Sequence, residues 1–253
     1  MYRYMSDSLT ATMIEMSGAG GDTIPAYLAT PEGDRSRGGV VVIHHMPGFD
    51  RSTKEIVRRF AELGYDAICP NLHHREAPGA APDDAAAASR AKGGVTDDQL
   101  LGDVAGAAAQ LRGLPTSNGR VGVIGYCSGG RQSVLAACNL DLDAAVDCYG
   151  AYVTGTPPAG FPLKVTNLVD QLPNLRCPLL GLFGNDDKHP SPEHVDELEH
   201  LLKDNGKQYE FHRYDEAGHA FFSPDRPSYR VAAANDGWER IEEFFAANLS
   251  QGA

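Results

Sequence analysis

The nine residues 122–130, with the sequence GVIGYCSGG, restrict the possible folds of this chain more than any other stretch. The alternating β-branched run at 120–124 is typical of a buried strand, and residues 131–138 predict a helix with small residues on its packing face. A strand that turns into a helix within about one residue forces Cys127 into a strained backbone conformation. The glycines two residues before and two residues after it leave room for the backbones to pass closely.

This arrangement of strand, Gly-x-Cys-x-Gly and helix resembles the nucleophile elbow of α/β-hydrolases, with cysteine in place of serine. Such a turn holds the sulfur of Cys127 above the sheet, at a helix N-terminus that favours a thiolate and an oxyanion. The short pattern also occurs by chance, and the alternative is a core cysteine that packs as a small hydrophobic residue. A nucleophile needs an acid and then a histidine further along the chain.

The length allows one large α/β domain or two small ones. Because no internal repeat and no interdomain linker is evident, we expect a single domain, 1–253, that needs no disulfide to be stable. Of the 253 residues 42% are hydrophobic and 22% are charged, and the formal net charge is −12. An acidic chain without a basic run is a poor binder of nucleic acid and of anionic membranes. Its five cysteines are scattered, residues 1–7 lack the apolar core of a signal peptide, and no apolar run has membrane length. We therefore expect a cytoplasmic protein.

The order of predicted elements indicates a mostly parallel, doubly wound sheet with helices on both faces. Two alternating runs, 11–16 and 24–29, predict an antiparallel hairpin at the N-terminal edge of this sheet, and the apolar run 40–45 predicts a fully buried strand. Residues 71–95 form a long excursion with few large apolar side chains, which we expect to border the active site as a cap. Further helices are predicted at 53–63, 99–111, 192–203 and 236–249, and further strands at 65–70, 143–150, 177–184 and 209–214.

An acid and a histidine follow two later strands, at the carboxyl ends where the catalytic groups of open parallel sheets collect. Asp186 and Asp187 come just after the predicted strand 177–184, and His219 comes just after the strand 209–214. Cysteine, aspartate and histidine therefore arrive in the order that an elbow nucleophile requires. The Gly-x-x-Asp spacing favours Asp187 over Asp186 as the acid.

With these residues in place, the chain resembles the dienelactone hydrolase family (carboxymethylenebutenolidases) over about residues 13–249. The segments that carry the resemblance are 125–130 (GYCSGG), 184–187 (GNDD) and 217–221 (AGHAF). The resemblance implies an α/β-hydrolase fold in which Cys127 is the nucleophile, Asp187 the orienting acid and His219 the base.

The implied reaction is hydrolysis of a carboxylic ester or a lactone through a thioester acyl-enzyme. His219 would take the proton of Cys127, and the backbone N–H groups of Ser128 and Met46 would hold the oxyanion. This chemistry requires no cofactor and no metal, and its partner is a small-molecule ester or lactone. We expect a monomer or a homodimer.

The chain departs from the family pattern at two positions. The best-known members carry a glutamate where this chain has His45, and they carry an arginine that binds the substrate carboxylate near Ser223. Three roles are therefore open for His45: it pairs with the Cys127 thiolate, it shapes the pocket, or it takes no part in proton transfer. A second arginine of the family pattern lies in the excursion, where only Arg90 approximates it.

Several aromatic and basic side chains are further candidates for the pocket. Phe222 and Tyr149 favour an apolar acyl or lactone substrate over a dienelactone carboxylate, and Tyr126 is a candidate for lining the pocket or tuning the thiol. Arg75 and Arg131 are candidate pocket cations, although arginine is more often solvated.

Two histidine pairs, His44-His45 and His73-His74, raise the question of a metal site. Adjacent residues on a strand point to opposite faces, so a single pair cannot easily chelate a metal. One histidine of each pair could meet near Asp50, but we expect no metal. The remaining cysteines lie in apolar patterns and are predicted to pack in the core: Cys69, Cys138, Cys148 and Cys177.

Two other functions stay open at the level of the sequence. The changes at positions 45 and 223 are compatible with a catalytically weak member that binds a small ligand in the same pocket. The same three residues could also cleave other acyl substrates, such as a thioester or a peptide, because a fold does not decide its substrate.

Overall fold

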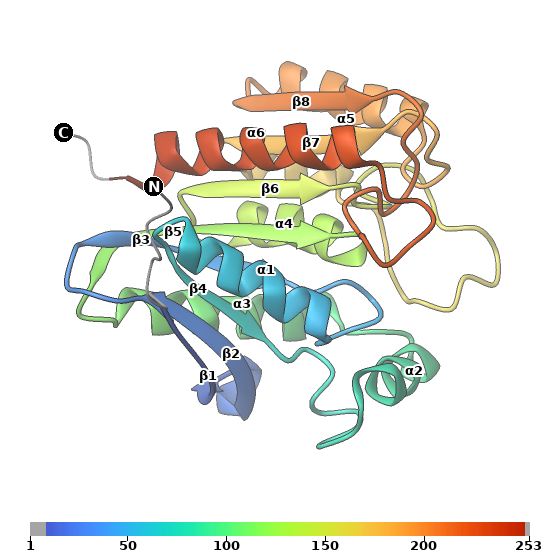
Figure 1. Ribbon diagram of the computed structural model, residues 1–253. Helices are drawn as coiled ribbons and strands as arrows, with labels where there is room; N and C mark the ends of the chain where they lie inside the picture. The colour runs from blue at the N-terminus through green and yellow to red at the C-terminus, as the bar shows by residue number, and fades with distance from the viewer. Residues whose placement is uncertain (1–8, 251–253) are drawn as a thin grey trace.

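The structure is a computed structural model in which residues 9–250 are described. Its centre is an eight-stranded sheet in the order β1-β2-β4-β3-β5-β6-β7-β8 (Figure 1). The strands are β1 (Leu9–Ser17), β2 (Thr23–Pro31), β3 (Arg37–Ile43), β4 (Asp66–Pro70), β5 (Ser117–Tyr126), β6 (Ala144–Cys148), β7 (Leu179–Gly184) and β8 (Tyr209–Tyr214).

The pairing of the strands confirms the mostly parallel sheet with an antiparallel N-terminal edge. Strands β1 and β2 form the expected hairpin, and β2 also runs antiparallel to β4. All other neighbouring strands run parallel. Every residue of β3 and β4 is buried, as expected for central strands covered on both faces.

Helices cover both faces of this sheet, as the α/β pattern predicts. In Figure 1, α1 and α6 lie in front of the sheet and α3 and α4 lie behind it. The apolar side chains of α3, α4 and α5 pack against one face, and those of α1 and α6 pack against the other. The helices are α1 (Arg51–Glu62), α2 (Pro82–Lys92), α3 (Asp97–Arg112), α4 (Ser128–Asn139), α5 (Pro192–Asp204) and α6 (Val231–Leu249), with short 3-10 turns at Ala19–Gly21 and Val169–Asn174.

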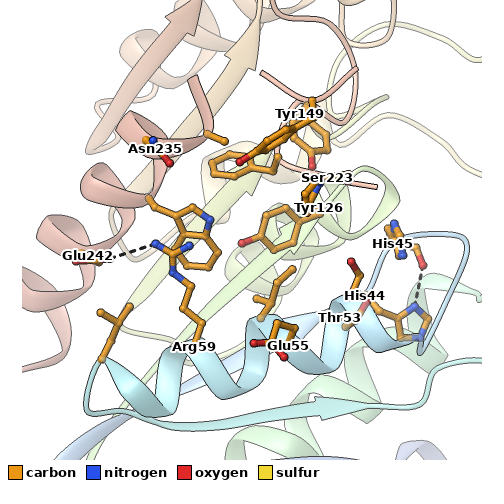
Figure 2. A pocket seen from close by; sticks show the side chains of 18 of the residues that line it. His44, His45, Thr53, Glu55, Arg59, Tyr126, Tyr149, Ser223, Asn235 and Glu242 are labelled. Atoms are coloured by element: carbon orange, nitrogen blue, oxygen red, sulfur yellow. Dashed lines mark hydrogen bonds and ion pairs between the residues drawn. The ribbon is translucent and has the colours of Figure 1, made fainter. Parts of the chain in front are cut away.

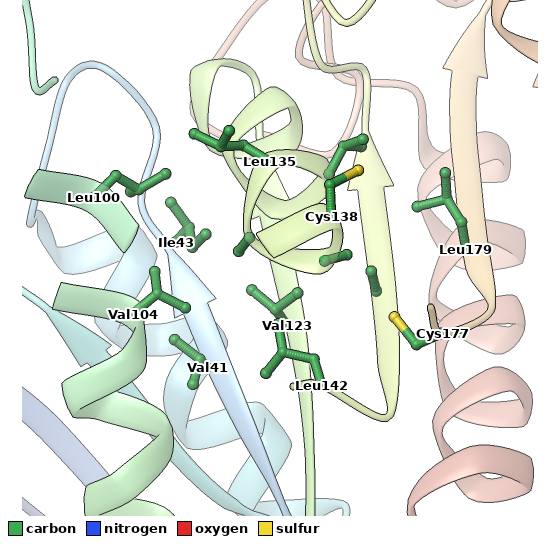
Figure 3. Packing of buried hydrophobic residues seen from close by; sticks show 14 of the residues in the cluster. Val41, Ile43, Leu100, Val104, Val123, Leu135, Cys138, Leu142, Cys177 and Leu179 are labelled. Carbon is green, nitrogen blue, oxygen red and sulfur yellow. The ribbon is translucent and has the colours of Figure 1, made fainter. Parts of the chain in front are cut away.

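Figure 3 shows the core on the face that α3 and α4 cover. Val41 and Ile43 of β3 and Val123 of β5 lie in one cluster with Leu100 and Val104 of α3, and all five side chains are inaccessible to solvent. Burying a side chain of this size stabilises the fold by about 1.5–3 kcal/mol. The cysteines outside the elbow are buried and free, as expected: Cys69, Cys138, Cys148 and Cys177.

The core fixes the carboxyl ends of β5, β7 and β8 at one edge of the sheet, which is where the candidate residues emerge. The excursion 71–95 crosses the same edge and contains α2. Across the described chain from residue 9 to residue 250, no helix combines the length and apolar character that crossing a membrane requires.

Candidate active site

The turn from β5 into α4 holds Cys127 at φ 59° and ψ −120°. This is a left-handed conformation that costs free energy for a side chain with a Cβ, and such strain is concentrated at functional sites. A Cβ on Gly125 would overlap the carbonyl oxygen of Gly129, and a Cβ on Gly129 would lie 2.5 Å from the carbonyl oxygen of Ile43. Both positions therefore require glycine so that α4 can start directly above the strands.

Asp187 and His219 meet beside this turn. Asp187 follows β7, its side chain is buried, and its Oδ2 accepts a hydrogen bond of 2.8 Å from Nδ1 of His219. Its Oδ1 accepts the backbone N–H of His189 at 2.9 Å, which fixes the carboxylate. Asp186 is exposed to solvent. The structure thus brings Asp187, and not Asp186, to the histidine.

Cys127 and His219 shift each other's pKa in opposite directions. Burial raises the pKa of the Cys127 thiol, but the hydrogen bond and charge of His219, with the N–H of Ser128, outweigh burial and hold this pKa below its usual value. Burial lowers the pKa of His219, whereas its hydrogen bonds to Asp187 and Cys127 outweigh that effect and raise it. The site therefore favours a thiolate beside an imidazolium.

A cavity of about 560 Å³ opens over Cys127 and His219, which is a volume typical of small-molecule sites. We call it the thiol cavity. Met46 and Ser128, the residues expected to supply the oxyanion hole, both line it. Arg90 and residues 93–95 of the excursion border it.

Sequence reasoning missed the apolar wall of the thiol cavity. Tyr152, Phe161 and Leu163, from the long connection after β6, line it. Their types gave no signal, because isolated aromatic and aliphatic residues are common in loops. Their position in the sequence did give a signal, because this connection begins at the carboxyl end of a central strand, where the binding sites of open parallel sheets form.

Three basic side chains line the thiol cavity, and they differ in burial and in charge pairing. Arg131 is buried and donates two hydrogen bonds to Asp97, at 2.9 and 3.1 Å, so its charge is already paired. Arg90 and Lys188 line the cavity and are exposed. Arg75, the other candidate cation, is not among the residues that line the cavity and pairs with Asp22 and Asp103.

Four residues expected in the substrate pocket line a different cavity, shown in Figure 2: His45, Tyr126, Tyr149 and Phe222. This cavity lies between α1, α6 and the sheet, and we call it the α1–α6 cavity. Among the described residues, none lines both cavities. For Tyr126 the reason is strand alternation, because it directly precedes Cys127 and its side chain leaves β5 on the other side. Ser223, the second departure from the family pattern, also lines the α1–α6 cavity.

The ring of His45 binds Asp50 rather than the thiol. The distance from Nε2 of His45 to Oδ2 of Asp50 is 2.7 Å. The other carboxylate oxygen of Asp50 accepts the backbone N–H of Thr53 at 2.8 Å and so caps the N-terminus of α1. His45 therefore supports a helix start, and of its three possible roles this contact does not favour the direct pair with Cys127.

His44 and His73 meet, with 4.7 Å between their ring centroids. Nδ1 of His44 lies 2.9 Å from the carbonyl oxygen of His45, and its Nε2 accepts the N–H of Leu72 at 3.2 Å. Burial lowers the pKa of His44 to about 3, so the ring is neutral and both nitrogens are occupied by backbone groups. Within residues 9–250, no group of three or more histidine, cysteine or acidic side chains is placed to hold a metal.

The sheet order, the two helical layers and the strained turn before α4 define an α/β-hydrolase fold. The sequence profile described as "Dienelactone hydrolase family" matches residues 24–249. The chain therefore belongs to the dienelactone hydrolase family.

Relatives with similar sequences carry hydrolase names. A "Putative carboxymethylenebutenolidase" of Methylorubrum extorquens is 35% identical over 225 residues, which cover 88% of this chain and 76% of the relative. The protein of the same name in Escherichia coli strain K12 is 36% identical over 231 residues, or 89% of this chain and 83% of the relative. A crystal structure of a dienelactone hydrolase, named putative, from Klebsiella pneumoniae matches with a TM-score of 0.82 at 29% identity, covering 95% of this chain and 99% of that one. The protein is a hydrolase of this family.

Proposed function

We propose that the protein hydrolyses a carboxylic ester or a lactone, with Cys127 as nucleophile, His219 as acid and base, and Asp187 as the residue that orients the histidine. One observation carries this proposal. A buried aspartate is hydrogen-bonded to a histidine beside a cysteine held in a strained turn, and all three line the same cavity.

Acylation follows from the charges of the site. The thiolate of Cys127 attacks the carbonyl carbon of the substrate, and the electron pair of the C=O bond moves to the oxygen. The backbone N–H groups of Ser128 and Met46 stabilise this oxyanion, and one such donor contributes on the order of 100- to 1000-fold in rate. When the intermediate collapses, the bond to the leaving oxygen breaks and the His219 imidazolium gives it the proton. An alcohol and a thioester on Cys127 result.

Deacylation uses the neutral histidine that acylation leaves behind. Nε2 of His219 accepts a proton from water as the water oxygen attacks the thioester carbon. The C–S bond then breaks, and the carboxylic acid leaves while the thiolate and imidazolium are restored. Asp187 keeps the proton on Nδ1 throughout, so Nε2 stays available to the sulfur and to water.

The thiol cavity favours a substrate with an apolar body. Tyr152, Phe161 and Leu163 offer contact to an acyl chain or a lactone ring. The exposed cations Arg90 and Lys188 are positioned to attract an anionic substituent. The relatives' name, carboxymethylenebutenolidase, supports testing an unsaturated lactone first.

Turnover of p-nitrophenyl esters, dienelactone and simple lactones by the wild type and by Cys127→Ala tests this function. We expect activity on at least one substrate, and its loss in Cys127→Ala. Cys138→Ala, which removes a buried cysteine of α4 outside the site, is the matched control and should stay active. Activity that survives Cys127→Ala would contradict the mechanism. An inactive protein with a reactive Cys127 would indicate another acyl substrate, and one with an inert Cys127 would indicate a ligand-binding protein.

A further inference from the structure

The α1–α6 cavity has the size of a ligand site, and the proposed hydrolysis does not use it. Its volume is about 560 Å³, within the range of small-molecule sites. Aromatic rings of Tyr126, Tyr149, Phe222 and Trp238 form much of its wall. Tyr149 separates the two cavities, because its ring centroid lies 6.3 Å from that of Tyr126 and 5.2 Å from that of His219.

One polar group in this wall has no partner. The side chain of Tyr126 is only 6% exposed, and within residues 9–250 its hydroxyl makes no hydrogen bond. Figure 2 shows this hydroxyl pointing toward the side of the cavity where Arg59 lies. Buried hydroxyl groups are nearly always hydrogen-bonded, so an unpartnered one that faces a cavity indicates a missing partner. Burial also raises the pKa of Tyr126 well above its usual value, so the hydroxyl keeps its proton and can donate it.

The charges around the cavity do not favour an anionic ligand. Three carboxylates line it, those of Glu55, Glu62 and Glu242. Arg58 pairs with Glu55, and the lining arginine Arg59 pairs with Glu242. That arginine is already engaged, since its guanidinium lies 3.8 Å from the centroid of the Trp238 ring and 3.7 Å from Glu242. An incoming anion would therefore approach carboxylates and a lining arginine that is already paired, whereas a neutral molecule carries no charge for the carboxylates to repel.

We propose that the α1–α6 cavity is a second ligand site, which binds a small neutral aromatic molecule whose carbonyl oxygen accepts the hydroxyl proton of Tyr126 in a hydrogen bond. The aromatic wall contributes stacking and edge contacts with the ring of the ligand. The hydroxyl supplies the polar contact that fixes its orientation. This site does not depend on the proposed hydrolysis.

The protein carries its own probe of this cavity, because Trp238 is its only tryptophan and lines the cavity wall. Acetophenone, a neutral aromatic ketone, is titrated against the full-length protein while tryptophan emission is followed. Ethylbenzene has the same shape without the carbonyl, and benzoate has the same ring with a charge. The affinities of these two are measured by displacement of acetophenone.

Two substitutions separate the hydroxyl from the cavity itself. Tyr126→Phe removes only the hydroxyl, so acetophenone should bind about three- to tenfold more weakly while ethylbenzene binds as before. Ala234→Leu adds a larger side chain to the α6 wall and should weaken both probes. Cys127→Ala changes the thiol cavity alone and should leave the binding of acetophenone unchanged, which separates the two sites.

Circular dichroism and thermal melting establish that each variant is folded, and Tyr126→Phe suffices if Ala234→Leu does not fold. Saturable binding of acetophenone, with a loss in Tyr126→Phe that ethylbenzene does not share, supports the proposal. Three results would overturn it: no saturable change in the emission of the wild type, equal effects of Tyr126→Phe on both probes, or benzoate binding as tightly as acetophenone. None of these results bears on catalysis, so failure of this site and failure of the proposed hydrolysis remain distinguishable.

Discussion

At the scale of single residues, the charge of the Cys127 thiol depends on one neighbour. Burial favours the neutral thiol, and the hydrogen bond and charge of His219 reverse this preference. Because the pKa of Cys127 is lowered, the thiolate persists below the usual range of a thiol and is lost only when the pH falls through the lowered value. His219→Gln removes the larger of the two effects that oppose burial and leaves only the Ser128 N–H. The pH profile of alkylation by iodoacetamide should then move up by about one unit or more, with roughly tenfold slower alkylation at neutral pH.

His189→Gln is the matched control for this measurement. His189 also lines the thiol cavity, but its ring is not among the groups that set the pKa of Cys127. The pH profile of alkylation in His189→Gln should therefore follow that of the wild type. A wild-type profile at the position of an ordinary thiol, or equal shifts in both variants, would contradict the proposed thiolate–imidazolium pair.

The sequence made it possible to predict that the groups following the strand ends lie close together. Cys127 comes directly after β5, and Asp187 and His219 come in the loops that follow β7 and β8, so the register of a parallel sheet brings the three together. The cavity that Tyr126 and Tyr149 line could not be predicted, because it depends on which face of the sheet each side chain takes. The sequence shows alternation, but it does not show that α1 and α6, which are distant in the chain, leave a cavity between them.

At the scale of elements, strong periodic patterns were located well and weak ones less so. The predicted helix 192–203 corresponds to α5, Pro192–Asp204, where a proline and a capping serine mark the start. The closing helix, predicted from 236, begins at Val231. Its N-terminus has no side-chain cap and its first turn is small and apolar, so the sequence carried no start signal there.

The start of α1 is an element whose capping can be tested. Asp50→Ala removes the acceptor of the Thr53 N–H and the partner of His45, and it should lower the free energy of unfolding by about 1–2 kcal/mol. Asp50→Asn keeps the oxygen that accepts the Thr53 N–H, so its free energy of unfolding should fall by less. The pKa of Asp50 is lowered to about 2, chiefly by its hydrogen bond to His45 acting against burial. The carboxylate's contribution is therefore present above the unfolded pKa of about 4 and lost as the pH falls through about 2.

Urea unfolding of the three proteins at neutral and at acid pH checks this prediction. The wild type should exceed Asp50→Asn in stability at neutral pH, and the difference should shrink as the pH falls. Equal stability of Asp50→Ala and the wild type at neutral pH would show that neither the cap nor the link to His45 stabilises α1.

At the scale of the whole molecule, an ion pair with a buried carboxylate ties the excursion 71–95 to α3. Arg75 donates two hydrogen bonds to Asp103 of α3, at 2.8 and 2.9 Å, and Asp103 is inaccessible to solvent. Asp103 also accepts the backbone N–H of Ala19, in the turn between β1 and β2, at 2.8 Å. Because the excursion borders the thiol cavity, the edge hairpin and the candidate active site share this anchor.

Removing Asp103, the buried partner of Arg75, should therefore lower stability far more than removing Asp22, its exposed partner. Asp103→Ala leaves the Arg75 charge without its buried partner and the Ala19 N–H without an acceptor, so we expect a loss of about 3–5 kcal/mol in urea unfolding. Asp22→Ala removes a second, exposed partner of Arg75 and should cost about 1 kcal/mol or less. Asp103→Ala should also expose the excursion to trypsin, since the ion pair holds it against α3. Equal stability and equal trypsin sensitivity in the two variants would mean that packing around α2, and not the Asp103–Arg75 pair, positions the excursion over the thiol cavity.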